Sequence, residues 1–303
     1  MNQELMSGLC QIAGREHVYE KEPMSRHTTF RIGGPADFFV VPQSPETLAD
    51  VVRFCRERGI PFYLVGNGSN LLVGDGGYRG VIIQVYKNLN QISVRGERIR
   101  AQAGAMLSVI ARKALEHSLT GFEFAAGIPG TLGGAVVMNA GAYGGEMKDV
   151  LYTARVLTKQ GEIREIPAER MEMGYRTSLV QKNGDIVLEA ELALAAGEPD
   201  RIRARMEELR EKRTSKQPLD MPSAGSTFKR PEGYFAGKLI MDAGLRGFCV
   251  GGAQVSEKHC GFVINTGDAT AAEVRELMNQ VICRVEEKFG VRLEPEVKML
   301  GEF

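Results

Sequence analysis

The sequence lacks several features that mark whole classes of protein. It contains no tryptophan. It also has no excess of charge of either sign, because 38 lysines and arginines balance 38 aspartates and glutamates among 303 residues. A nucleic-acid-binding protein typically carries a basic excess on one face, so zero net charge argues against that class. Balanced charge still allows a local basic pocket for a small anionic molecule. We therefore expect a small-molecule partner and no nucleic acid.

Cysteines are few, and their spacing is irregular. They are Cys10, Cys55, Cys249, Cys260 and Cys283, an odd number without a CxxC pair. This pattern indicates neither a zinc site nor a disulfide framework. We expect buried structural thiols in a reducing compartment and no bound metal.

The sequence also lacks a long uninterrupted apolar run. Its first 17 residues contain an early acid and no apolar core segment, which argues against a signal peptide. The most apolar stretch, 121–145, is interrupted by Glu123, Pro129 and many glycines, so a membrane-spanning helix is not expected. We predict a soluble cytoplasmic protein, monomeric and without a membrane partner.

Glycine, by contrast, is abundant and clustered. The 36 glycines gather in three stretches, at 66–80, 121–145 and 225–267. Around the first cluster, Ser44 before Pro45 is typical of a helix start, and Gly59 of a helix end. The first lobe, about 1–88, is expected to contain a strand, this helix and two further strands, at 37–41, 44–59, 61–65 and 80–85.

The remaining periodicity predicts a second lobe and a separate last domain. The second lobe, about 89–197, should contain two hairpins, a helix and a further strand, at 91–103, 153–166, 106–117 and 185–194. The charged segment 200–216, with Ile202, Met206 and Leu209 on one face, predicts an exposed linking helix. The last domain, 198–303, should contain a helix capped by Thr270 and Glu273 and a strand at 291–300. The fold class is α+β.

Two of the glycine clusters have the composition of ligand-binding loops. In GNGSN, Gly66 and Gly68 allow tight turns, and successive N–H groups from Gly66 to Asn70 can surround an anion such as a diphosphate. The generic dinucleotide fingerprint fits poorly here, since Leu71 replaces its third glycine, and a plain loop is an alternative. The run 125–146 contains more glycine than a connection needs, which favours a ligand lying against it; a tightly packed structural segment is the alternative.

These motifs together resemble a known family. HTTFRIGGPAD at 27–37, GNGSN at 66–70 and AGIPGTLGGAVVMNAGAYG at 126–144 are similar to the FAD-binding half of the UDP-N-acetylenolpyruvoylglucosamine reductases, the MurB family. That family belongs to the vanillyl-alcohol-oxidase-like, PCMH-type flavoprotein superfamily. The resemblance covers nearly the whole chain. It implies a two-lobed FAD-binding region at 1–197, a smaller α+β substrate-binding domain at 198–303, and FAD held non-covalently.

The resemblance also implies which residues carry the chemistry. YRTS, GSTFKRP and EPEV match family motifs in the family order and assign catalytic roles to Arg176, Ser226 and Glu296. Without the resemblance, each has an ordinary alternative: a surface charge, a turn serine and an exposed carboxylate. The implied cofactor contacts are Arg31, Gly66, Asn67, Gly68, Ser69, Asn70, Gly127, Ile128, Pro129, Gly130, Gly133, Gly134, Asn139 and Gly141.

The implied reaction reduces UDP-N-acetylglucosamine enolpyruvate with NADPH as the reductant. Arg176 would hold the substrate carboxylate, Glu296 would hydrogen-bond to the same group, and Ser226 would donate a proton to C2. Tyr175, Lys216, Arg230 and His259 are expected to bind substrate, although Lys216 also fits a solvated helix face and His259 a core histidine.

Two points remain open from the sequence. The run from Arg176 to Asp185 is expected to lead straight into the next strand, without the tyrosine loop of long-form members. The alternatives to a reductase are an oxidase of the same superfamily, which would have no reason to contain Ser226 and Glu296 in these settings, and a non-catalytic nucleotide-binding or electron-transfer subunit.

Overall fold

The computed structural model describes residues 2–303, which divide into two compact units. Unit 1 comprises the residues up to Tyr19, Phe39–Asn67 and Ile82–Arg213. Unit 2 comprises Glu20–Phe38, Gly68–Val81 and Thr214–Phe303. A four-stranded sheet has the order β1-β2-β5-β3, and the division between the units falls within three of its strands. The four strands are β1 (Val18–Pro23), β2 (Pro35–Val40), β3 (Phe62–Val65) and β5 (Tyr78–Gln84).

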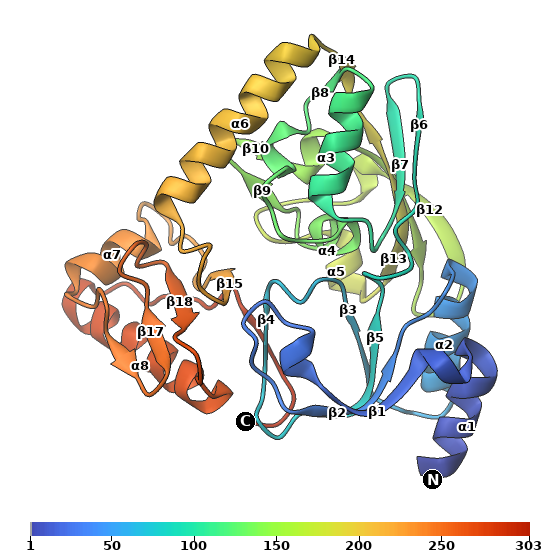
Figure 1. Cartoon of the computed structure of the whole chain (residues 1–303), viewed down its shortest axis with the longest axis horizontal. Coiled ribbons are helices and arrows are strands. Elements are labelled where there is room, and N and C mark those ends of the chain that lie inside the picture. The colour runs from blue at the N-terminus through green and yellow to red at the C-terminus, as the bar shows by residue number, and fades with distance from the viewer. Residues whose placement is uncertain (1) are drawn as a thin grey trace. The chain divides into compact units, whose positions relative to one another are not determined.

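The core of unit 1 lies between an antiparallel sheet and short helices (Figure 1). The sheet has the order β12-β11-β13-β7-β6. Its strands are β6 (Ile92–Arg95), β7 (Arg98–Gln102), β11 (Leu151–Leu157), β12 (Ile163–Pro167) and β13 (Ile186–Ala193). Helix α3 (Leu107–Glu116) buries Leu107, Ile110 and Ala111, and α4 (Leu132–Val137) buries Leu132 and Val136. Both predicted hairpins are thereby confirmed.

The remaining elements of unit 1 follow local sequence signals. Helix α2 (Pro45–Glu57) begins at Ser44, whose side chain accepts a hydrogen bond from the Thr47 N–H, as its sequence predicts. It packs against α1 (Asn2–Ala13). The smaller elements are η1 (Arg15–His17), β8 (Leu119–Thr120), η3 (Glu123–Ala125), β9 (Gly141–Ala142), β10 (Gly145–Glu146), η4 (Met147–Asp149), η5 (Ala168–Arg170), α5 (Leu179–Asn183) and β14 (Ala195–Ala196).

Helix α6 (Pro199–Lys216) confirms the predicted charged helix, since Ile202 and Leu209 are buried while most of its residues are exposed. The run from Arg176 to Asp185 leads into β13 at Ile186, as predicted, and it contains a helix that the prediction did not include. Residues 179–183 form the short helix α5, which ends at Gly184 in a left-handed conformation. A five-residue helix gives too short a periodic signal to be recognised from sequence.

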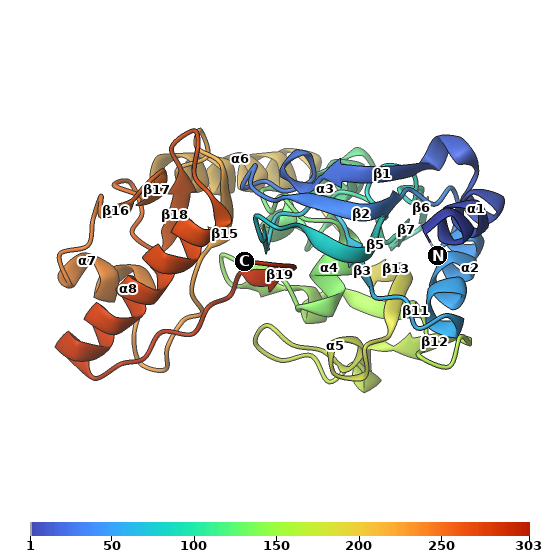
Figure 2. The ribbon, with the colours of Figure 1, turned by 90° about the horizontal axis from the view of Figure 1, so that it is seen from below.

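Unit 2 is built on a sheet of order β15-β18-β17-β16, along which α8 (Ala271–Phe289) runs (Figure 2). The strands are β15 (Ser223–Ser226), β16 (Cys249–Val250), β17 (Ala253–Val255) and β18 (Phe262–Asn265), with η2 (Met24–Arg26) and α7 (Ala236–Asp242) nearby in the unit. The predicted capping box of Thr270 and Glu273 at the start of α8 is confirmed. Val274, Leu277 and Val281 lie on its buried face.

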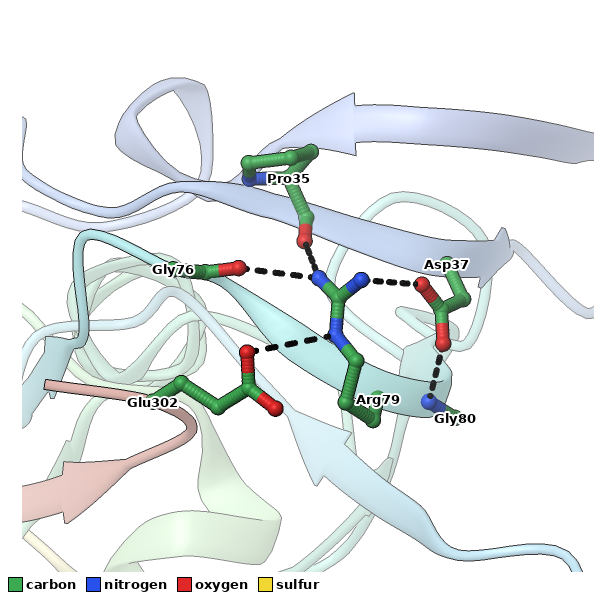
Figure 3. A network of polar contacts seen from close by, with 6 residues as sticks. All are labelled: Pro35, Asp37, Gly76, Arg79, Gly80 and Glu302. Carbon is green, nitrogen blue, oxygen red and sulfur yellow. Dashed lines mark hydrogen bonds and ion pairs between the residues drawn. The ribbon is translucent and has the colours of Figure 1, made fainter.

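The predicted terminal strand at 291–300 is much shorter in the structure. Only β19 (Lys298–Leu300) forms, in parallel with β4 (Leu71–Val73), while the residues before it bond to the loop after β15. Arg79 fastens this end of unit 2: its guanidinium donates to the Pro35 and Gly76 carbonyls and pairs with Asp37 at 2.8 Å and Glu302 at 3.8 Å (Figure 3). Backbone and side chain thus fix the last strand together.

The expectation of buried cysteines is confirmed for only part of the set. Cys55 and Cys260 are buried, and burial raises the pKa of Cys55 to about 12. Cys249 and Cys283 are exposed, so the prediction was wrong for these two. In residues 2–303, no helix has the length and apolarity needed to cross a bilayer. No cluster of three or more His, Cys, Asp or Glu side chains in that range is arranged to hold a metal ion.

Candidate active site

The GNGSN loop connects β3 to β4 and presents unused backbone donors. None of the N–H groups from Gly66 to Asn70 donates a hydrogen bond to another of the residues that the structure describes. Gly68 is buried with φ +64°, and a Cβ there would lie 2.0 Å from the His27 carbonyl oxygen. Only glycine fits this position. A run of successive N–H groups without protein acceptors is a donor set that can bind an anion.

The second glycine loop, leading into α4 in unit 1, has the same property. The N–H groups of Gly130, Thr131 and Gly134 donate to no other residue within 2–303. Gly133 is needed for packing, since a Cβ there would meet Ala103 Cβ at 2.9 Å. Gly134 is different, because a Cβ built on it has no atom within 4 Å. One glycine of the pair therefore serves the core and the other faces open space.

The two loops are joined within unit 1. The Asn67 side-chain amide donates to the Pro129 carbonyl at 2.8 Å, and a Cβ on Gly66 would lie 2.2 Å from Thr131 Oγ1. Ile128 packs against the core of unit 1, and Gly141 pairs with Glu146 in the β9–β10 hairpin. Unit 1 thus brings together Gly66, Asn67 and the predicted residues of the second loop.

In unit 2, Glu296 and Ser226 lie on adjacent segments of chain. The Glu296 N–H donates to the Thr227 carbonyl at 2.8 Å, immediately after Ser226. The Asn70 side chain donates to the Glu296 carbonyl at 3.2 Å, and the Asn70 carbonyl accepts from Lys298 N at 3.0 Å. Glu296 is only 8% exposed, whereas Ser226 is an exposed residue. The structure therefore brings the two predicted catalytic residues of this unit together with Asn70 of the GNGSN loop.

In unit 1, Arg176 lies at the tip of a two-residue turn. Gly174 and Thr177 exchange backbone hydrogen bonds of 3.1 and 3.3 Å, with Tyr175 and Arg176 between them. Arg176 has φ +57°, a left-handed conformation that is uncommon for a residue with a Cβ. Arg31 and Asn139 share this conformation, with φ +57° and +44°. Backbone strain of this kind concentrates at functional sites, and three predicted site residues carry it.

Comparisons with known proteins agree with this arrangement. Residues 217–300 match the family model described as UDP-N-acetylenolpyruvoylglucosamine reductase, C-terminal domain, and residues 36–167 match an FAD binding domain. UDP-N-acetylenolpyruvoylglucosamine reductase of Lachnoclostridium phytofermentans is 54% identical to this chain over 306 residues, covering 100% of the chain and 99% of the relative. The chain belongs to the UDP-N-acetylenolpyruvoylglucosamine reductase (MurB) family.

Two further MurB relatives support the same conclusion. The reductase of Clostridioides difficile is 52% identical over 301 residues, with 99% of each chain covered. The crystal structure of MurB from Thermus caldophilus superposes with a TM-score of 0.80 at 34% identity, covering 92% of this chain and 97% of that one. The predicted fold class and family are thereby confirmed.

The residues of this MurB-family chain fit an FAD diphosphate chemically. Both glycine loops offer backbone N–H donors that no other residue in 2–303 uses, and neither 66–70 nor 127–134 contains an acidic side chain that would repel an anion. Gly134 adds open space beside those donors. Donors without competing carboxylates are the set that a diphosphate requires.

The residues predicted to bind substrate are divided between the units. In unit 2, burial lowers the pKa of His259 and the charge of Lys216 lowers it further, against a backbone hydrogen bond that raises it. The Gly261 N–H donates to His259 Nδ1 at 3.1 Å, which leaves Nε2 as the protonated nitrogen of the neutral ring. Arg230, in the same unit, stacks on the Phe235 ring at 4.0 Å. In unit 1, Tyr175 is 54% exposed beside Arg176.

The sequence reasoning missed Arg213, which lies against the second glycine loop. Its Cδ is 3.1 Å from the position that a Cβ on Gly127 would occupy, and burial lowers the pKa of its guanidinium. Within residues 2–303 it forms no ion pair with a carboxylate. A partly buried cation without a carboxylate partner suits an anion-binding loop. Its position in a strongly charged helix made it look like an ordinary surface arginine.

Proposed function

We propose that this chain reduces UDP-N-acetylglucosamine enolpyruvate to UDP-N-acetylmuramate, with NADPH as the reductant and FAD as the bound cofactor. The observation that carries the proposal is the 54% identity over the full length to a UDP-N-acetylenolpyruvoylglucosamine reductase. The proximity of Ser226 and Glu296 in unit 2 supports it. The product is a precursor of peptidoglycan.

One set of residues would bind the cofactor, and another set would bind the substrate and take part in its reduction. Bound FAD would supply the hydride-transfer chemistry that links NADPH to C3 of the enol ether. The N–H groups of Gly66–Asn70 and those of Gly130, Thr131 and Gly134 would hold its diphosphate. Arg31, Gly127 and Gly141 belong to the same proposed cofactor set, with region 1–197 as the FAD-binding part of the chain.

Arg176, Glu296 and Ser226 would act on the enolpyruvyl group. As hydride reaches C3, negative charge builds on C2 and the conjugated carboxylate. The fixed guanidinium of Arg176 stabilises that charge, and Glu296 binds the same carboxylate when protonated. Ser226 Oγ–H then transfers its proton to C2, which completes the addition of one hydride and one proton.

The proposal places the nucleotide part of the substrate in region 198–303. Lys216, Arg230 and His259 supply cationic and hydrogen-bonding groups there, and Tyr175 supplies an exposed ring and hydroxyl. A cytoplasmic site of action follows from a nucleotide-sugar substrate and an NADPH supply. Action as a monomer, without nucleic acid or membrane, stays a prediction.

An anaerobic stopped-flow experiment tests the function directly. NADPH is added to the purified FAD-loaded protein to bleach the flavin band, and the enol ether is then mixed in. Rapid return of the oxidised flavin absorbance is the expected result. Bleaching without recovery would retain a flavoprotein and reject the substrate, and recovery with oxygen alone would indicate an oxidase.

A further inference from the structure

Asn139 connects three segments of unit 1 through its side chain. It follows α4, is 2% exposed and has φ +44°. Its Nδ2 donates to Glu146 Oε2 at 2.9 Å and to the Gly174 carbonyl at 3.0 Å, while its Oδ1 accepts from Lys148 N at 2.9 Å. Both amide protons and the carbonyl oxygen are therefore engaged by the protein itself.

The orientation of this amide is fixed by chemistry. Glu146 Oε2 and the Gly174 carbonyl are acceptors, and Lys148 N–H is a donor, so exchanging the nitrogen and oxygen of Asn139 would oppose like groups at all three contacts. Hydrogen bonding from Lys148 lowers the pKa of Glu146, with smaller contributions from Asn139 and the positive charge of Arg176. The carboxylate thus remains ionised as the acceptor at neutral pH.

The Gly174 carbonyl is the point where this network reaches Arg176. Gly174 is the first residue of the turn that closes on Thr177, and Arg176 occupies the strained position within it. Ser178, fully buried, donates to the Val137 carbonyl at 2.7 Å and anchors the other side of the turn. Both anchors connect the turn to α4 or to the residues just after it. The position of α4 therefore fixes the position of the turn that carries Arg176.

We infer that Asn139 is a positioning residue that sets the location of Arg176 through the Gly174 carbonyl. This role differs from the cofactor contact that the sequence suggested, because no donor of the amide remains for a ligand. It rests on the proposed function, in which Arg176 holds the substrate carboxylate. A displacement of about 1 Å at such a group can cost about a hundredfold in rate.

Asn139→Asp tests the inference, because it keeps the shape and replaces both donors by an acceptor that faces Glu146 and the Gly174 carbonyl. We expect reoxidation of reduced flavin by the enol ether to slow about 10- to 100-fold. Flavin reduction by NADPH and the Kd for FAD should be almost unchanged. Asn139→Ser, which adds no charge, replaces this variant if it does not fold.

The matched control is Asn265→Asp in unit 2. Asn265 is 3% exposed, donates to the Phe30 carbonyl at 3.1 Å and accepts from Gly267 N and Ala269 N. It has the same buried amide pattern without a bond to the Arg176 turn. We expect this control to lower Tm while leaving the ratio of the two half-reaction rates as in the wild type.

Two further readouts separate positioning from other roles. In an Arg176→Ala background, Asn139→Asp should cause no additional loss, because its effect passes through Arg176. Trypsin should cleave faster after Arg176 in folded Asn139→Asp than in the wild type, which reports the loosened turn without any substrate.

Several outcomes would overturn the inference. An additive loss in the double variant, a raised Kd for FAD or unchanged trypsin cleavage would each do so. If the wild type itself is not reoxidised by the enol ether, the proposed function fails, and the trypsin result still decides whether Asn139 holds the turn.

Discussion

In unit 1, Arg176 lies in a turn that the side chains of Asn139 and Ser178 anchor, whereas in unit 2 Glu296 lies on a segment that backbone hydrogen bonds anchor. The Glu296 N–H bonds to the Thr227 carbonyl, and two residues later Lys298 N bonds to the Asn70 carbonyl. Main-chain contacts of this kind survive most side-chain changes. The comparison therefore predicts that single substitutions displace Arg176 more easily than Glu296.

The largest effect should come from Ser226→Ala, which removes a reacting group rather than a support. We expect reoxidation by the enol ether to slow by about 10²- to 10⁴-fold, the usual contribution of a positioned acid, with flavin reduction nearly intact. Ser223→Ala, on the same strand β15, serves as the control and should leave both rates unchanged. If Ser226→Ala slowed flavin reduction and flavin reoxidation equally, the role of the serine would be structural.

The two glycine loops should respond differently to the same added methyl group. Gly68→Ala forces a Cβ to 2.0 Å from the His27 carbonyl at φ +64°, which should cost about 3 kcal/mol of unfolding free energy. Gly134→Ala meets no atom within 4 Å and should hold or raise stability while weakening FAD binding. Denaturant unfolding and a flavin fluorescence titration measure the two effects. Equal stability losses would contradict the distinction.

Thr227→Val tests how far backbone support protects Glu296. Thr227 is 1% exposed, and its Oγ1 accepts from Val263 N at 2.9 Å, so the valine variant leaves a buried N–H unsatisfied. We expect a loss of about 1–3 kcal/mol in unfolding free energy. The Thr227 carbonyl still accepts from Glu296 N, so the reoxidation rate at low temperature should stay near that of the wild type. A large rate loss in the folded variant would show that the backbone alone does not hold Glu296.

The smallest effect concerns Glu146, whose pKa is lowered chiefly by its hydrogen bond with Lys148. A carboxyl with a lowered folded pKa stabilises the protein above its ordinary pKa of 4.5, and loses that contribution as the pH falls through the lowered value. Glu146→Gln should therefore lower Tm slightly at neutral pH, with the difference disappearing in acid. Thermal melting across this range checks the sign, and a difference that grows in acid would refute it.

Local signals in the sequence predicted much of the fold. The Ser44 and Thr270 caps are formed as their sequences indicate, because capping depends on a few neighbouring residues. Segment 291–297 was misread as strand, because its partner is a loop about 65 residues earlier rather than a sheet. Tertiary contacts of this kind leave no periodic pattern.

The sequence predicted the motif residues of the site, but not the residues that pack against them or position them. Arg176, Ser226 and Glu296 were identified through family motifs, while the packing of Arg213 against Gly127 depends on the path of α6. Asn139 was named only as an implied cofactor contact, whereas its three bonds join segments at 139, 146–148 and 174. Its partners are set by the fold, which one residue in a sequence does not reveal.

The pairing of β4 with β19 also has a consequence for the order in which the protein is made. Residues 71–73 find their parallel partner only at 298–300, about 230 residues later, and within 2–303 no other strand pairs with β4. At about 5–20 residues per second, a ribosome needs roughly 11–45 s to add that much chain. During that time the backbone groups of β4, beside the GNGSN loop, have no partner strand. Such an unpaired strand edge can pair wrongly with another chain in a crowded cell. The segment carrying Glu296 thus closes only after residues 298–300 are made, and the Arg79 contacts with Asp37 and Glu302 then secure this part of unit 2.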